Sequence, residues 1–127
     1  MGNSVHITGQ VVKGRYPYAI KESKTGAHFI PLSVATYRTE IRRDEGEVSI
    51  PTYHRVVVYG NENFLERSIL PLLMIGAPVC ICGEIRYSTL FDDDGRRKQL
   101  SEIIVFPNQN IGYIEFPDYQ ARSEHVS

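Results

Sequence analysis

One helical segment lies between the third and fourth of five strand-like segments, and this order limits the available folds more than any other feature of the chain. The strand-like segments alternate apolar with polar residues or contain β-branched runs, as strands with a buried face do. They span residues 3–13, 28–41, 49–59, 77–87 and 98–107. A helix is predicted over residues 62–74, where Asn61 can cap its N-terminus and an apolar stripe follows. The pattern indicates an all-β protein with one helix.

Five strands with a helix between strands 3 and 4 are the order of an OB-fold, a five-stranded Greek-key barrel whose lower end the helix can close. A β-sandwich is the alternative for a β-rich chain of 127 residues, but it generally uses about seven strands. We expect Pro71 to distort the last helical turn and Gly76 to cap the C-terminus of the helix. The predicted domains are an OB-fold domain over residues 1–110 and a partly loose C-terminal extension over residues 111–127.

The charge balance of the chain predicts no broad attraction to a polyanion. Fourteen basic and fifteen acidic residues give a net charge of −1, so binding to nucleic acid would depend on where individual side chains lie. No apolar run reaches the 18 or so residues of a membrane helix. The N-terminus lacks the pattern of a secretory signal. We therefore expect a cytoplasmic protein with no membrane partner.

Residues 52–60 are the strongest candidate for a binding site. In a strand, alternate side chains share a face, so Tyr53, Arg55 and Tyr59 are predicted to lie together while His54 points to the other side. Tyrosine rings can stack on the bases of a single-stranded nucleic acid, and a guanidinium can contact phosphate or stack on a base. The competing interpretation is that both tyrosines only cover the surface of the barrel.

Two predicted loops carry further combinations of aromatic and basic residues that could contact a nucleic acid strand. The residues concerned are Arg86, Phe91 and Lys98 around a hairpin loop over residues 92–97, and Arg15 and Tyr18 in a long polar loop over residues 14–26. Three consecutive aspartates, residues 92–94, cancel most of the charge of the hairpin. A solvated turn is therefore the alternative interpretation of that loop.

The sequence contains no arrangement typical of catalysis, of a cofactor site or of a metal site. Cys80 and Cys82 have no second pair of Cys or His residues at a usable spacing, so they are predicted to be free strand cysteines. The aspartates at 92–94 lack the later glutamate of a calcium loop, and the four histidines are scattered. We expect no enzymatic activity, no cofactor and no bound metal.

Several segments of the chain resemble the bacterial single-stranded DNA-binding protein family. The most specific is Tyr53-His-Arg-Val-Val-Val-Tyr-Gly60, where the family has an aromatic-His-Arg-Val-Val-x-aromatic-Gly pattern. Further similar segments cover residues 3–9, 31–36, 79–86 and 101–105. The similarity is collinear over residues 3–107, which include all five predicted strands.

The resemblance implies an OB-fold protein that forms a homotetramer and wraps single-stranded DNA without strong sequence preference, in replication, recombination or repair. It assigns base stacking to Tyr53 and Tyr59 and phosphate contacts to Arg55 and Arg86. It also places His54 near the subunit contacts. A protein with this function would be found in the bacterial cytoplasm, associated with the nucleoid.

The first predicted strand is a candidate for contact between subunits. It is rich in valine and isoleucine and is short of the charges that block edge pairing. Val5 and Ile7 are therefore predicted to support pairing of two copies across a two-fold axis. The expected assembly is a dimer or a tetramer.

The chain departs from the family in three respects, one of which is a first loop that is longer than usual. It has no tryptophan, whereas the family typically stacks bases on several. Near the corresponding positions are Tyr37, followed by Arg38, and Phe91, and these residues complete the predicted DNA contacts. The family usually continues into a Gly- and Gln-rich linker with an acidic tip that recruits replication and repair proteins. The chain ends at Ser127 without either, so recruitment by that route is not expected.

These departures keep two alternatives open. The first is an accessory OB protein like that of the restart primosome, because such proteins also lack the acidic tail and many lack the tryptophans. The second is an OB protein-interaction module with reduced DNA binding. Loss of the tryptophans favours this module, whereas the retained Tyr53, Arg55, Tyr59 and Arg86 count against it.

Overall fold

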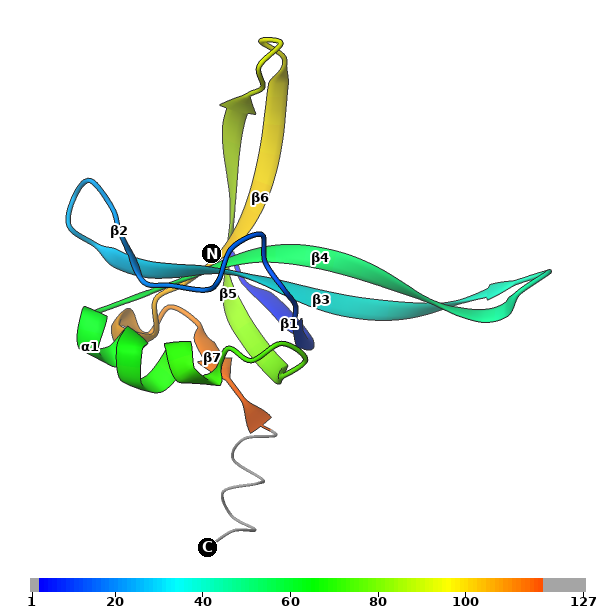
Figure 1. Ribbon diagram of the computed structural model, residues 1–127, viewed down its shortest axis with the longest axis horizontal. Coiled ribbons are helices and arrows are strands. Elements are labelled where there is room, and N and C mark those ends of the chain that lie inside the picture. The colour runs from blue at the N-terminus through cyan, green and yellow to red at the C-terminus, as the bar shows by residue number, and fades with distance from the viewer. Residues whose placement is uncertain (1–2, 118–127) are drawn as a thin grey trace, which may run out of the picture.

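The computed structural model describes residues 3–117, and a seven-stranded sheet forms most of this part of the chain (Figure 1). The strands are β1 (Val5–Val11), β2 (Lys21–Glu22), β3 (His28–Arg42), β4 (Gly46–Gly60), β5 (Pro78–Phe91), β6 (Arg97–Val105) and β7 (Tyr113–Glu115). The helical segments are α1 (Glu62–Phe64), η1 (Leu65–Ile69), η2 (Leu70–Leu72) and η3 (Pro107–Gln109). None of the helices in this part of the chain is long and apolar enough to cross a membrane.

Five of the strands close into a ring in the order β1-β3-β4-β6-β5, and β5 pairs back with β1. The pairings are antiparallel except that of β4 with β6, which is parallel. The helical segment lies between β4 and β5 and packs against one end of the ring (Figure 1). The predicted OB-fold, with its helix between the third and fourth strands of the ring, is confirmed.

The core of the ring follows from the alternation of apolar residues along each strand. Side chains of one parity point inward and are almost completely buried. Their neighbours face outward, and of these Ala35, Val57 and Ile104 are also buried. The inward set includes Ile30, Leu32 and Val34 of β3, Val56 and Val58 of β4, Val79 and Ile81 of β5, and Ile103 and Val105 of β6. Leu65 and Ile69 of the helical segment complete this cluster at the end of the ring that the helical segment covers.

The helical segment differs from the continuous α-helix that was predicted over residues 62–74. The Asn61 cap is present, since its side-chain oxygen accepts a hydrogen bond from the backbone N–H of Phe64 at 2.8 Å. The segment then passes through a π-helical turn and ends in a 3₁₀ turn that contains Pro71. Proline has no N–H to continue the α-helical pattern, so the distortion expected at Pro71 is found.

The expectation that Gly76 caps the helix is wrong. The last helical segment ends at Leu72, and Gly76 lies in the following turn with a φ of +90°, a conformation that glycine adopts without strain. Its N–H donates to the carbonyl of Val11 at 2.7 Å. Gly76 therefore directs the chain from the helical segment into β5.

Two long hairpins extend away from the ring (Figure 1). One is formed by β3 and β4, which pair over all fifteen residues of each strand. The other is formed by the outer parts of β5 and β6, which pair from Glu84 with Ile104 out to Phe91 with Arg97. Both hairpins are longer than predicted because pairing satisfies the backbone hydrogen bonds even where the side chains are exposed.

Two short strands were not predicted. β2 lies within the long polar loop and pairs with the start of β3. β7 pairs with β5 from Tyr113 opposite Cys82 to Glu115 opposite Cys80, and Phe116 directly after it is buried in the core. The sheet therefore includes part of the predicted C-terminal extension, while residues 118–127 of that extension lie outside the described residues.

Candidate nucleic-acid interface

The side chains of β3 and β4 that point away from the ring interior form one face, which we call the β3–β4 face; Ala35 and Val57 on it are buried. Residues directly opposite each other on paired strands share a face. The pairs on this face are Phe29 with Tyr59, Pro31 with Val57, Ser33 with Arg55, Ala35 with Tyr53, and Tyr37 with Pro51. Tyr53, Arg55 and Tyr59 therefore share one face as predicted, and the structure adds Tyr37 to it. In an OB-fold this face, with the loops beside it, is where oligonucleotides bind.

Tyr53 and Tyr37 present open aromatic surface at the outer end of the β3–β4 face. The Tyr53 side chain is 68% exposed and that of Tyr37 is 53% exposed. Neither ring is stacked on another aromatic ring of the described residues. Both rings are therefore available to a base.

Tyr59 has a different environment, at the other end of the face. It is the middle member of an aromatic row formed by Phe29, Tyr59 and Phe106. The Phe106 ring stacks on Tyr59 with a centroid distance of 4.6 Å and an angle of 17°, and the Phe29 ring lies 5.5 Å away at 40°. These neighbours cover much of the ring of Tyr59. A base that reaches this end of the face therefore contacts three packed rings and not an isolated Tyr59 ring.

Arg55 is held by a carboxylate on the same surface. Its Nε donates to Oε2 of Glu102 on β6 at 2.5 Å, and the Glu102 side chain is only 18% exposed. Arg86 on β5 lies directly opposite Glu102, so this carboxylate sits between both predicted phosphate contacts. Glu102 was not predicted as a site residue, because it belongs to a strand that is distant in sequence from Arg55. The ion pair orients Arg55 and reduces its net charge.

The loop between β1 and β3 covers one side of the face and encloses a cavity of about 170 Å³, which we call the basic groove. The cations lining it are Arg15, Lys21 and Arg55. The exposed aromatic side chain of this loop is Tyr16, at 70%, and the Arg15 guanidinium lies 5.6 Å from its ring centroid. This arrangement suits a phosphate backbone with a base beside it.

Tyr18 serves to hold this loop in place. Its hydroxyl donates to the carbonyl of Val12 and accepts from the N–H of Ser33 at 3.2 Å. The ring is half-buried and packs against the core cluster. The loop therefore offers Tyr16 as its stacking surface, with Tyr18 beneath it.

The hairpins separate some of the predicted contacts. Arg38 pairs opposite Ile50 and lies on the reverse of the β3–β4 hairpin from Tyr37. Lys98 pairs opposite Leu90, so these two share a face of the β5–β6 hairpin with Arg86, whereas Phe91 lies on its reverse. Phe91 is 72% exposed, and the exposed ring of Tyr87 shares its side of the hairpin.

The residues predicted to lie at subunit contacts occupy two places. Val5 and Ile7 are half-buried and pack against the chain's own core cluster. His54 is half-buried at the root of the β3–β4 hairpin, where its Nε2 lies 2.9 Å from the Thr36 hydroxyl. Within the described residues, β1 pairs with β3 only at Gln10 and Val11, so the edge from Val5 to Thr8 is open on that side.

The outer surface of β1, β5 and β7 carries the two cysteines. Cys80 and Cys82 are half-buried free thiols that face the hydroxyl groups of Thr8 and Ser4. Beside them, the Tyr113 hydroxyl lies 3.0 Å from Nε2 of His6. Desolvation, together with the nearby Cys82 and Glu115, raises the pKa of the Tyr113 phenol. Within residues 3–117 no cluster of His, Cys, Asp and Glu side chains is placed to hold a metal ion.

Fold and surface together define an OB-fold protein with an aromatic and basic face on its second and third barrel strands. A family model described as the single-strand binding protein family matches residues 2–110, and the chain belongs to this family. Among solved structures, it is similar to the Plasmodium falciparum SSB in complex with ssDNA, with 27% identity and a TM-score of 0.71. The match covers 91% of this chain and 95% of that chain. No curated protein matches this chain.

Proposed function

We propose that the protein binds single-stranded DNA without strong sequence preference, by stacking on exposed aromatic rings and by phosphate contacts. The observation that carries the proposal is the β3–β4 face, where the open rings of Tyr53 and Tyr37 lie beside the basic groove. The family and the similar Plasmodium structure with bound ssDNA support the same ligand. The function would be exercised in replication, recombination or repair, in the bacterial cytoplasm.

The strand would run along the β3–β4 face. Its phosphates would meet Arg15, Lys21 and Arg55 in the basic groove, and its bases would meet Tyr16, Tyr53 and Tyr37. Each base presents a flat π surface, so stacking tolerates any sequence. The two long hairpins extend this surface and carry the outlying contacts Arg86 and Lys98 (Figure 1).

A second candidate is the OB protein-interaction module with reduced DNA binding. The ion pair of Arg55 with Glu102 and the enclosed ring of Tyr59 favour it, because both limit what the face offers to DNA. Titration of labelled oligo-dT at two salt concentrations separates the candidates. Saturable binding that weakens with salt supports the DNA-binding protein, and absence of binding at low salt supports the module.

The salt dependence of binding should identify the phosphate contacts. Arg86→Ala and Arg55→Ala are each expected to weaken oligo-dT binding. Each should also lower the log–log salt slope by about 0.7 per subunit engaged, the contribution of one neutralised phosphate on a single strand. Fluorescence anisotropy at four or more salt concentrations gives the slope. An unchanged slope in both variants would show that neither guanidinium touches the backbone.

Glu102→Gln is the matched variant for this experiment. It removes the carboxylate charge that pairs with Arg55 and faces Arg86, while it keeps a side chain of the same size. We expect tighter binding than in the parent protein, since Arg55 no longer shares its charge with a carboxylate and no negative charge remains on the residue opposite Arg86. Weaker binding would show that Glu102 is needed to orient Arg55.

Self-association is expected to give a dimer or a tetramer. The open edge of β1 from Val5 to Thr8 leaves backbone groups that a second copy can pair with across a two-fold axis. Light scattering at micromolar concentration tests this. A mass of 14.5 kDa, that of one chain, would contradict the prediction.

A further inference from the structure

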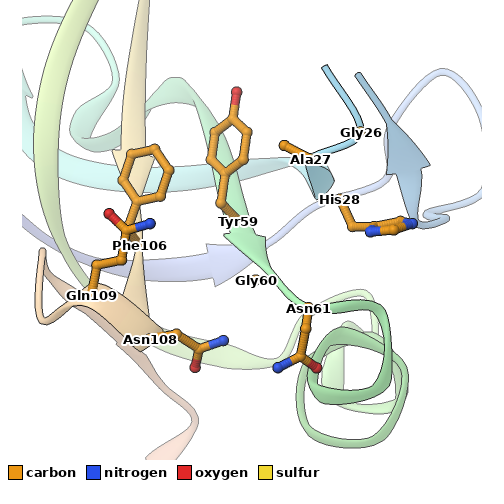
Figure 2. A pocket seen from close by; sticks show the side chains of 9 residues that line it. All are labelled: Gly26, Ala27, His28, Tyr59, Gly60, Asn61, Phe106, Asn108 and Gln109. Atoms are coloured by element: carbon orange, nitrogen blue, oxygen red, sulfur yellow. The ribbon is translucent and has the colours of Figure 1, made fainter. Parts of the chain in front are cut away.

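A second cavity, of about 370 Å³, opens beside the aromatic row (Figure 2). Its volume is within the range of small-molecule sites. Four segments of the chain meet around it: the turn before β3, the end of β4, the cap of α1, and η3. We call it the amide pocket, and its lining residues are Gly26, Ala27, His28, Tyr59, Gly60, Asn61, Phe106, Asn108 and Gln109.

The space in this pocket depends on small residues. Gly26 has no side chain and Ala27 carries only a methyl group at the rim. A Cβ on Gly60 would lie 2.9 Å from the ring of Phe64 and 3.5 Å from Nδ2 of Asn108. Glycine at position 60 therefore lets the helical segment approach closely and keeps the floor of the pocket free.

The lining carries no permanent charge, and this distinguishes the amide pocket from the basic groove. It includes no Lys, Arg, Asp or Glu. The closest carboxylate to His28, that of Glu62, lies 3.7 Å from its Nε2 and disfavours an anion nearby. A phosphate would meet no lysine or arginine in this lining. The uncharged, flat part of a nucleotide, its base, fits the chemistry of the lining.

The lining combines an aromatic wall with free amide groups. Tyr59 and Phe106 form the wall, and Gln109 lies beside Phe106 (Figure 2). The Asn61 and Asn108 side chains approach the lower end from opposite sides (Figure 2). The Asn61 oxygen is used by the helix cap. The side-chain amides of Asn108 and Gln109 have no hydrogen-bond partner among the described residues.

We infer that this pocket receives one base of the bound strand and prefers adenine. An amide offers a donor and an acceptor side by side, and adenine is the base that Asn and Gln side chains bind with two hydrogen bonds, through its 6-amino group and N7. Tyr59 and Phe106 belong both to the pocket and to the aromatic row, so a strand on the β3–β4 face passes its opening. The inference rests on the proposed function and adds a base preference at one position.

The experiment compares dT tracts with tracts of the same length that carry one dA at successive positions. With the parent protein, the best-placed dA should bind at least about fivefold more tightly than dT, the lower end of the discrimination that a two-bond contact supplies. An unsubstituted purine at that position keeps the stacking surface but lacks the 6-amino group, so it should lose most of the gain. Asn108→Ala and Gln109→Ala should each bring the ratio of dA to dT affinity toward one.

Asn63→Ala is the matched control, because Asn63 is an exposed amide in α1 that does not line the pocket. It should retain the full preference for dA. If the parent protein binds dT tracts and shows no preference at any position, the pocket assignment fails while the proposed function stands. If it binds no tract at all, the proposed function fails. A dA preference that survives in both Asn108→Ala and Gln109→Ala would also overturn the assignment.

Discussion

Tyr59→Ala is expected to lower the free energy of unfolding by about 2–3 kcal/mol. The substitution removes a half-buried ring from between Phe29 and Phe106 and leaves a gap in the aromatic row. Each aromatic pair contributes about 0.5–1.5 kcal/mol beyond area burial, and a fully buried Phe→Ala change costs about 3–5 kcal/mol. Urea denaturation followed by circular dichroism measures the change in midpoint at constant slope.

The control for this prediction is Tyr59→Phe, which keeps the ring and should change stability by less than about 0.5 kcal/mol. A Tyr59→Ala variant as stable as the parent would show that the aromatic row contributes nothing to the fold. This expectation replaces the simpler one that Tyr59 is a surface ring whose removal affects only DNA binding. The row was not predicted from the sequence, because Phe106 directly follows β6 and is distant in sequence from Phe29 and Tyr59.

Tyr53→Ala is expected to weaken binding to oligo-dT by about 1–3 kcal/mol, with little change in stability. Removing one stacking ring costs about this much in single-strand binding. Tyr53 is 68% exposed and lies opposite Ala35, so few contacts within the chain are lost. Anisotropy with oligo-dT measures the affinity, and the urea midpoint should agree with that of the parent to within about 0.5 kcal/mol.

Tyr53→Phe separates stacking from hydrogen bonding by the hydroxyl group. It should retain most of the affinity, since the π surface is unchanged. If Tyr53→Ala folds normally and binds oligo-dT as tightly as the parent, DNA does not cross this end of the β3–β4 face. Comparison with Tyr59→Ala then shows whether the other end of the face carries the strand.

The sequence alone was sufficient for features that repeat along the backbone. The period of two along a strand places Tyr53, Arg55 and Tyr59 on one face, and the opposite parity fills the core. The position of the helical segment among the strands led to the OB-fold. The Asn61 cap and the distortion at Pro71 were also predictable, because both act within a few residues.

Tertiary structure decided what each of these side chains contacts. Arg55 meets Glu102, 47 positions away, and Tyr59 meets Phe106, only because β4 pairs in parallel with β6. Tyr18 holds the first loop through a carbonyl and an N–H on different segments, and Tyr16 is thereby left exposed. The physical reason is that strand alternation is a local property of the chain. By contrast, the partner of an outward side chain depends on strand order and register, which arise only when distant segments pair.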